Sequence, residues 1–298
     1  MTAFEITRIG AVALDLLGEC AGGEAEVVGL FERSFYLLTD AGYVCIGNSE
    51  IGDGPINLVT EALSGDELKR LGVFPEAKAR VTSGSIEFDD SGHSFGFADA
   101  QVWTPPPWPL PVPNWATTLA ELRALIARSA PREGLARAVL DPAYTATHEA
   151  QSAQGSLSAL RQDMPAALRS GATEPELHSA ATLLVGLGPG LTPSGDDVLG
   201  GLFLALTAVN QRPIRDALWE SIGPELEHLT VPISAMHLAL AADGQAAAAL
   251  HQVVGAVLGG SMEEVRTAVV QAGKIGASSG WDGMAGVLLA LECLRQDR

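Results

Sequence analysis

The pattern of hydrophobic and polar positions changes near the middle of the chain. Before residue 104, short apolar runs are separated by turn residues, which is typical of strands. EVVGLFERSFYLLT (26–39) and YVCIG (43–47) flank the turn Asp40-Ala41-Gly42 and predict a β-hairpin. GSIEFDDSGHSFGFADAQVW (84–103) predicts a second hairpin with its tip at residues 89–92. Short helices are expected over residues 13–20 and 61–70.

After residue 115, apolar residues recur three and four positions apart, which predicts amphipathic helices. Examples are TTLAELRALIARSA (117–130) and IRDALWESI (214–222). Thr173–Glu176 and Ser261–Glu264 have the spacing of capping boxes that open helices. We therefore expect an α+β protein, with a β-rich N-terminal domain over residues 1–103 and a mainly helical C-terminal domain over residues 116–298.

A proline-rich segment, TPPPWPLPVPNW (104–115), separates the two patterns. Its prolines must run as an extended chain. Trp103, Trp108 and Trp115 accompany them, and large aromatic rings favour burial. We expect a strap packed across a surface.

The helical half contains an internal repeat of a loop that leads into a helix. SGDDVLGGLFLAL (194–206) and SGWDGMAGVLLAL (279–291) share Ser-Gly-x-Asp, a glycine four residues after that aspartate, and a final Leu-Ala-Leu. Two such copies are expected to pack about a pseudo-twofold axis. Gly201 and Gly286 would let the two helices approach closely.

The first copy is preceded by a glycine-rich loop, GLGPGLTPSGDD (186–197). Capping alone could explain Ser-x-x-Asp, because the serine and the aspartate can both bond to the first turn of a helix. Capping does not explain Gly186, Gly188 and Gly190, nor the second aspartate, Asp196. The alternative is a loop shaped to bind a ligand.

The spacing of Gly190 and Gly195 matches half of a Walker phosphate loop, but Asp196-Asp197 replaces the lysine and hydroxyl residue that would complete it. Backbone N–H groups at two helix starts still suit a small anion. The aspartates would repel that anion unless they accept from an amide, bind a metal or cap their helices. A small ligand that bears both a carboxylate and an amide fits both requirements: its carboxylate would accept from the loop N–H groups, and its amide would donate to the aspartates.

These considerations give a set of candidate site residues. We expect catalytic roles for the three aspartates, Asp196, Asp197 and Asp282. Ligand contacts are expected from Gly188, Gly190, Thr192, Ser194, Gly195, Ser278, Ser279 and Gly280. Valine at Gly188 or Gly195 should block binding with little loss of fold. Asp196 and Asp197 could together hold Mg²⁺, but no metal and no cofactor is expected.

The pairing of GLGPGLTPSGDD with the later GASSGWDGMAG (276–286) resembles the AllH-like family, long catalogued as a domain of unknown function. The resemblance implies that residues 188–197 and 278–282 form its signature. It also implies a subunit of oxamate carbamoyltransferase in allantoin catabolism, which works with other enzyme subunits. That enzyme interconverts oxalurate and phosphate with oxamate and carbamoyl phosphate.

The chain departs from the better-known carbamoyltransferases. It has no Ser-Thr-Arg-Thr segment like that of the aspartate and ornithine enzymes, so their mechanism does not transfer. Lys274, just before the second loop, is either a local anion contact or an ordinary surface lysine. Thr230, Ser234 and His237 could share one helix face as a Ser/His nucleophile, but no nucleophile-elbow motif surrounds the serine.

Net charge, apolar runs and cysteine usage exclude some partners and locations. A formal net charge of −18 argues against nucleic acid or an anionic membrane as a partner. The N-terminus lacks a signal-peptide pattern, the apolar run 198–209 is too short to span a bilayer, and Cys20, Cys45 and Cys293 are expected to be buried thiols, so a cytoplasmic location is expected. Three hypotheses remain: a carbamoyltransferase subunit, a non-catalytic anion-binding or scaffold subunit, and a stand-alone hydrolase or lyase that acts on a small amide.

Overall fold

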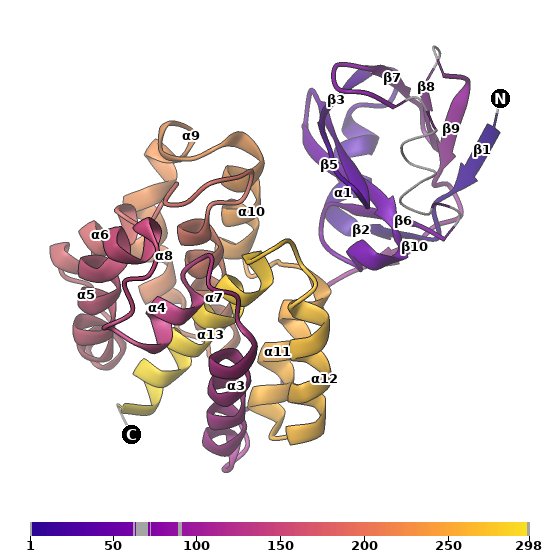
Figure 1. The fold of residues 1–298 in the computed structure, drawn as a ribbon. Coiled ribbons are helices and arrows are strands. Elements are labelled where there is room, and N and C mark those ends of the chain that lie inside the picture. Colours follow the sequence, from indigo (N-terminus) through magenta and orange to yellow (C-terminus); the bar gives the residue numbers. More distant parts are fainter. Residues whose placement is uncertain (1, 62, 64–70, 72, 89–90, 297–298) are drawn as a thin grey trace. The chain divides into compact units, whose positions relative to one another are not determined.

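The computed structural model describes residues 2–61, 63, 71, 73–88 and 91–296. It divides into two compact units, Met1–Pro105 and Pro106–Arg298. The first unit is built around a β-sheet and the second consists of helices (Figure 1). The predicted α+β class, with a helical C-terminal part that contains the loop-helix repeat, is confirmed.

Within the described residues, ten strands of the first unit form one sheet in the order β1-β9-β8-β7-β3-β4-β5-β6-β2-β10. The strands are β1 Thr2–Glu5, β2 Arg8–Gly10, β3 Glu24–Leu30, β4 Ser34–Thr39, β5 Gly42–Asn48, β6 Asn57–Thr60, β7 Lys78–Val81, β8 Ser85–Phe88, β9 His93–Gly96 and β10 Gln101–Trp103. Strand β1 lies at one end of this order, and β2 lies next to the strand at the other end. Ile6 and Thr7 connect them: the Ile6 N–H donates to the Gly96 carbonyl, and the Thr7 N–H donates to the Val59 carbonyl. The sheet therefore curls back on itself. Its apolar face and helix α1 (Ala11–Glu19) enclose a core of their own.

Both predicted hairpins are present. In the first, Thr39 pairs with Gly42 across the β4–β5 turn, and in the second, Phe88 pairs with His93 between β8 and β9. The segment 26–39 contributes two strands, because the chain turns at the exposed residues 31–33 and forms β3 and β4 as antiparallel neighbours. The tip residues 89–90 and most of the helix expected over 61–70 lie outside the described residues.

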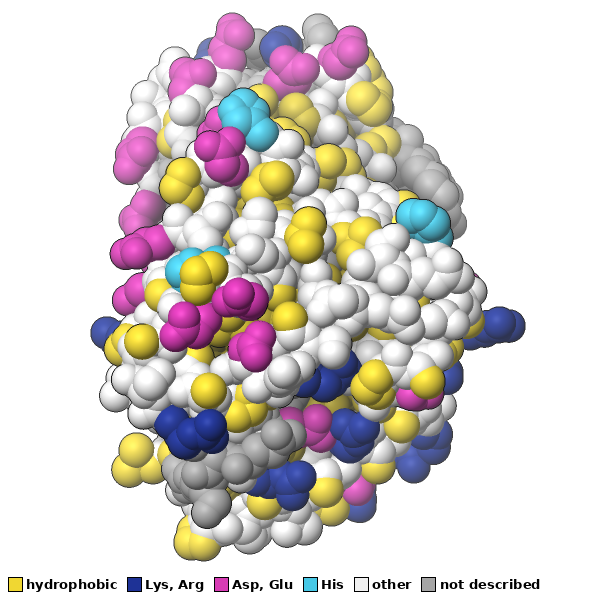
Figure 2. Space-filling model, turned by 90° about the vertical axis from the view of Figure 1, so that its left-hand side faces the viewer, with side chains coloured by type: hydrophobic (Ala, Val, Ile, Leu, Met, Phe, Trp, Pro, Cys, Tyr) yellow, Lys and Arg dark blue, Asp and Glu magenta, His cyan; other side chains and the backbone are white. Residues whose placement is uncertain are grey.

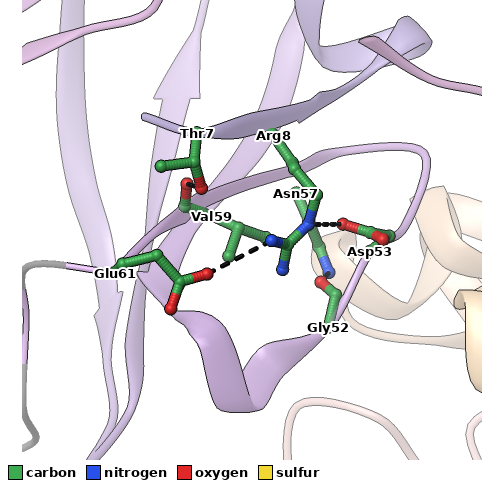
Figure 3. Close-up of polar contacts among 7 residues, drawn as sticks. All are labelled: Thr7, Arg8, Gly52, Asp53, Asn57, Val59 and Glu61. Atoms are coloured by element: carbon green, nitrogen blue, oxygen red, sulfur yellow. Dashed lines mark hydrogen bonds and ion pairs between the residues drawn. The ribbon is translucent and has the colours of Figure 1, made fainter. Parts of the chain in front are cut away.

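A polar cluster ties the loop before β6 to strand β2 (Figure 3). The Arg8 guanidinium contacts Asp53 at 2.6 Å and Glu61 at 3.2 Å, and the hydrogen bond with Asp53 raises the pKa of Arg8. Nearby, the Asn57 amide donates to the Gly52 carbonyl at 3.0 Å. Asp53 thus lies in an ion pair that fastens the loop before β6 to β2.

The helices of the second unit pack around an apolar centre. Its helices are α3 Trp115–Ser129, α4 Ala136–Leu140, α5 His148–Ser170, α6 Pro175–Thr182, α7 Ser194–Ala208, α8 Arg212–Ile222, α9 Leu226–Leu229, α10 Pro232–Ala242, α11 Ala248–Gly259, α12 Met262–Ala272 and α13 Ser279–Gln296. Among the described residues, the second unit also has the 3₁₀ turn η2 Gly223–Glu225, and the first unit has the 3₁₀ turn η1 Ser49–Ile51. Helix α7 is buried on nearly every side, as expected for a helix that is apolar all round.

The two predicted capping boxes have different outcomes. Ser261 caps α12 as expected, with its hydroxyl accepting from the Glu264 N–H at 3.2 Å. The box at Thr173 is wrong, because α6 begins at Pro175 and has no side-chain cap. Proline at the first position fixes the helical dihedral without a cap, and the Thr173 hydroxyl contacts His178 instead.

The proline-rich segment lies against α11 along its second part. The Trp108 ring stacks on His251, with ring centroids 4.5 Å apart, and the Val112 N–H donates to the Leu258 carbonyl at 3.0 Å. Trp115 is buried at the start of α3. These contacts hold residues 108–115 on the helical unit.

Acidic side chains outnumber basic ones, with 36 Asp and Glu against 18 Lys and Arg. Figure 2 shows both kinds on the face turned to the viewer, among hydrophobic and other side chains. Cys20, Cys45 and Cys293 are buried free thiols, as expected. Among the described residues, no helix is both long enough and apolar enough to cross a membrane.

Candidate functional site

Helices α7 and α13, the two halves of the repeat, lie side by side in close contact (Figure 1). A side chain at Gly201 would collide with the Gly283 carbonyl, and one at Gly286 would collide with the Val198 carbonyl. Equivalent positions of the two copies thus make equivalent contacts. The repeat seen in the sequence is a pseudo-twofold helix pair in the structure.

The two helix starts have the same local geometry. The Gly195 N–H donates to Leu187 at 2.9 Å, and the Gly280 N–H donates to Ile275 at 3.0 Å. A Cβ atom at Gly195 or Gly280 would strike a backbone carbonyl of the preceding segment. The expectation that Gly195→Val leaves the fold nearly intact is therefore wrong, because this glycine is needed where the helix meets its own loop.

The loops ahead of these helices need glycine and touch each other. Gly188, Gly190 and Gly276 have φ values of 122°, 98° and 57°, which L-residues rarely adopt. The Thr192 and Ser279 hydroxyls form a hydrogen bond of 2.8 Å. This bond joins the first loop to the start of the second helix.

The aspartates and serines of the two copies face each other crosswise. The Ser279 hydroxyl of the second copy lies beside Asp197 of the first, and the Ser194 hydroxyl of the first lies beside Asp282 of the second. Each hydroxyl lowers the pKa of the carboxyl beside it. Helix α7 has Pro193 at its cap position and no side-chain cap. The capping interpretation of Ser194 therefore does not hold, since its hydroxyl faces the other copy.

Burial dominates the electrostatics of this carboxyl pair. Burial raises the pKa of Asp197 well above its usual range, and repulsion by Asp282 raises it further. Burial also raises the pKa of Asp282, to about 6. The Oδ2 atoms of both are shielded from solvent and accept no hydrogen bond of good geometry from the described residues. The pair thus has unused hydrogen-bonding capacity at the point where the loops meet.

Asp196 has different partners from its neighbour Asp197. Its Oδ1 accepts from the Gly186 N–H at 2.7 Å, and its Oδ2 accepts from the Ser234 hydroxyl at 2.6 Å and from the Thr230 hydroxyl. Asp196 therefore anchors the entry of the first loop to the start of α10. Within the described residues, no cluster of three or more His, Cys, Asp or Glu could hold a metal.

Asp282 fastens a third segment to the site. Its carboxylate is 0% exposed, and its Oδ1 accepts from the Leu135 and Ala136 N–H groups, both at 2.7 Å. Gly134, with a φ of 80°, packs directly on the carboxylate. Sequence reasoning missed this segment, because backbone N–H groups distant in sequence leave no residue pattern.

Two other candidates make ordinary structural contacts. The Ser234 hydroxyl donates to Asp196, and burial lowers the pKa of His237 to about 4. This arrangement gives no support to a Ser/His nucleophile. Lys274 is exposed and donates to the Gln271 side chain at 3.1 Å.

An open groove lies next to the first loop. It holds about 550 Å³ between helices α5 and α6, and its lining includes Gly155, Ser156, Ser179 and Leu183. Leu187, the residue before Gly188, also lines it. The groove therefore adjoins the loop through one apolar residue and lies outside the carboxyl pair.

Comparison with known proteins gives one match. The family model of oxamate carbamoyltransferase subunit AllH matches residues 184–291, which span both loops and both helices of the repeat. No curated protein and no solved structure matches the chain significantly. By this match and by the loop pair it covers, the chain is similar to the AllH family over residues 184–291.

Proposed function

We propose that this protein is a carbamoyltransferase subunit whose paired loops bind a small ligand bearing a carboxylate and an amide, or carbamoyl phosphate. The AllH match supports the enzyme class. The reaction proposed is the interconversion of oxalurate and phosphate with oxamate and carbamoyl phosphate. We place it in cytoplasmic purine and allantoin catabolism, together with other enzyme subunits.

The single observation that supports a shared site is the crosswise meeting of the loops. Thr192 bonds to Ser279, and Asp197 lies beside Asp282 with a shielded, unused oxygen on each carboxyl. Two unrelated helix starts would have no reason to bring these groups together. One ligand that touches both loops would use them.

The loop backbone supplies donors for the anionic part of the ligand. The N–H groups of Gly190, Leu191 and Thr192 have no acceptor among the described residues. The N–H groups of Gly195 and Gly280 are already bonded within the protein. Glycine-rich loops with free N–H groups bind carboxylate or phosphate oxygens, so this role falls to the first loop.

The aspartates divide their roles in this proposal. Burial and repulsion by Asp282 raise the pKa of Asp197, which favours the protonated carboxyl, and in that form it can donate a hydrogen bond to a ligand oxygen. A neutral acid also avoids the repulsion that a carboxylate would exert on an anion. Asp196 and Asp282 each hold a distant segment of the protein in place through hydrogen bonds, so we assign those bonds to positioning. Catalysis then rests on positioning and electrostatic stabilisation, without a covalent nucleophile.

Calorimetric titration of the isolated chain with oxamate and with carbamoyl phosphate tests the site. Asp197→Ala should weaken binding about tenfold or more, the effect of losing one buried hydrogen bond. Asp197→Asn keeps a neutral donor and should bind nearly as well as the natural protein. Asp243→Ala, at an exposed aspartate after α10, is the matched control and should have no effect.

The titration also separates the carbamoyltransferase subunit from the non-catalytic scaffold subunit. Binding that is unchanged by Asp197→Ala would place the ligand elsewhere. Binding that is absent from the isolated chain and appears only with other subunits would support the non-catalytic scaffold subunit instead.

A further inference from the structure

We propose that Arg132 binds the anionic group of the ligand held by the paired loops. The inference rests on the proposed function and adds a specificity-determining residue to it. Arg132 belongs to neither copy of the repeat. The ligand class it selects is a small carboxylate or phosphate.

The paired loops lack a positive charge for such a ligand. They supply hydroxyls, backbone N–H groups and the aspartates 196, 197 and 282. Lys274 is exposed and engaged with Gln271. An anion placed beside these carboxyls needs a cation to offset their repulsion.

The segment that carries Arg132 abuts the site. Asp282 holds the Leu135 and Ala136 N–H groups, and a Cβ atom at Gly134 would lie 2.5 Å from Asp282 Oδ2 and 2.8 Å from Ser278 Cβ. Arg132 is two residues from Gly134, so their Cα atoms are at most about 7 Å apart. A long arginine side chain at this position can reach the mouth of the loops.

The backbone of this segment is held in place. The Arg137 Nε donates to the Pro131 carbonyl at 2.9 Å, and its Nη2 donates to the Ala130 carbonyl at 2.6 Å. The Tyr144 hydroxyl donates to the Arg132 carbonyl at 2.9 Å. These bonds fix where the Arg132 side chain begins.

The Arg132 guanidinium itself is uncommitted. It is exposed and makes no ion pair or hydrogen bond with any described residue. Two other arginines of this unit are engaged: Arg123 bonds to Glu292 and to the Leu140 carbonyl, and Arg161 bonds to a carbonyl of α4. A planar guanidinium binds a carboxylate or phosphate through two parallel hydrogen bonds, which fits this role.

Calorimetry on the full chain tests the proposal, with separate titrations of oxamate, carbamoyl phosphate and inorganic phosphate. Arg132→Gln should raise the Kd of the ligand that binds about tenfold or more and flatten its dependence on salt. The Kd of Arg132→Lys should lie between those of the natural protein and Arg132→Gln. Arg128→Gln removes the same charge at an exposed position of α3 and should change nothing.

The three titrations show whether the arginine serves a carboxylate or a phosphate. If the natural protein binds and Arg132→Gln binds equally well, the role of Arg132 is overturned and the proposed loop site stands. If the natural protein binds none of the three ligands, both proposals are overturned.

Discussion

At the residue scale, the three aspartates of the loops illustrate how neighbours in sequence acquire different surroundings. Asp196 is saturated by one N–H and two hydroxyls, and Asp282 holds two N–H groups with one oxygen. Asp197 has no such anchor and is left facing Asp282. Asp197 has the fewest internal bonds of the three, and for this reason we propose it as the aspartate that contacts the ligand.

Asp282 should make stability depend on pH. A carboxyl whose pKa is raised in the folded state stabilises the fold below its unfolded pKa, and this stabilisation is lost as the pH rises through the folded value, about 6 here. Asp282→Asn keeps an oxygen for Leu135 and Ala136 but cannot ionise. Between pH 4 and 7, the free energy of unfolding of the natural protein should fall by about 2 kcal/mol more than that of Asp282→Asn.

Urea unfolding at several pH values measures this difference. Relief of repulsion on Asp197 acts in the same direction, so the variant should be the more stable protein at pH 7. Parallel stability curves for the two proteins would show that Asp282 ionises normally in the fold.

At the element scale, the site depends on how closely α7 and α13 pack. Gly201 and Gly286 bring each helix onto a backbone carbonyl of the other, and this contact brings Ser194 and Ser279 within reach of the opposite aspartate. Any side chain at these glycines would push the helix starts apart. Helix packing therefore sets the geometry of the loops.

Adjacent glycines in α7 offer a matched test of that packing. Gly201→Ala should destabilise the protein by about 3 kcal/mol, since its methyl group would strike the Gly283 carbonyl. At Gly200 a Cβ atom would make an ordinary 3.6 Å contact with Ala241. Gly200→Ala should therefore be neutral or stabilise by up to about 1 kcal/mol through helix propensity. Equal effects of the two variants in thermal unfolding would contradict the close helix contact.

At the scale of the whole molecule, the chain has two units with separate apolar cores. The family match lies entirely within the helical unit. Both loops, the helix pair and the Asp282-bound segment also belong to that unit. The proposed binding site can therefore be understood from the helical unit alone.

The sequence predicts as much of this as its local patterns contain. Hydrophobic periodicity predicts the α+β class, and the repeated Ser-Gly-x-Asp predicts that two loops belong together. The partners of the aspartates are not predictable in this way. Asp282 meets backbone N–H groups of residues 135–136, and Asp196 meets hydroxyls that tertiary packing brings from residues 230 and 234. Within its own segment, Ser-Gly-x-Asp is equally compatible with a helix cap, so the sequence alone does not distinguish capping from a ligand site.

The central claim is that the two loops form one ligand site. A crystal structure of the protein soaked with oxamate tests this most directly. We predict ligand density between the loops, within hydrogen-bonding distance of Asp197 and of the backbone at Gly190–Thr192. Density only in the groove between α5 and α6, or loops that remain empty while calorimetry shows binding, would contradict the account.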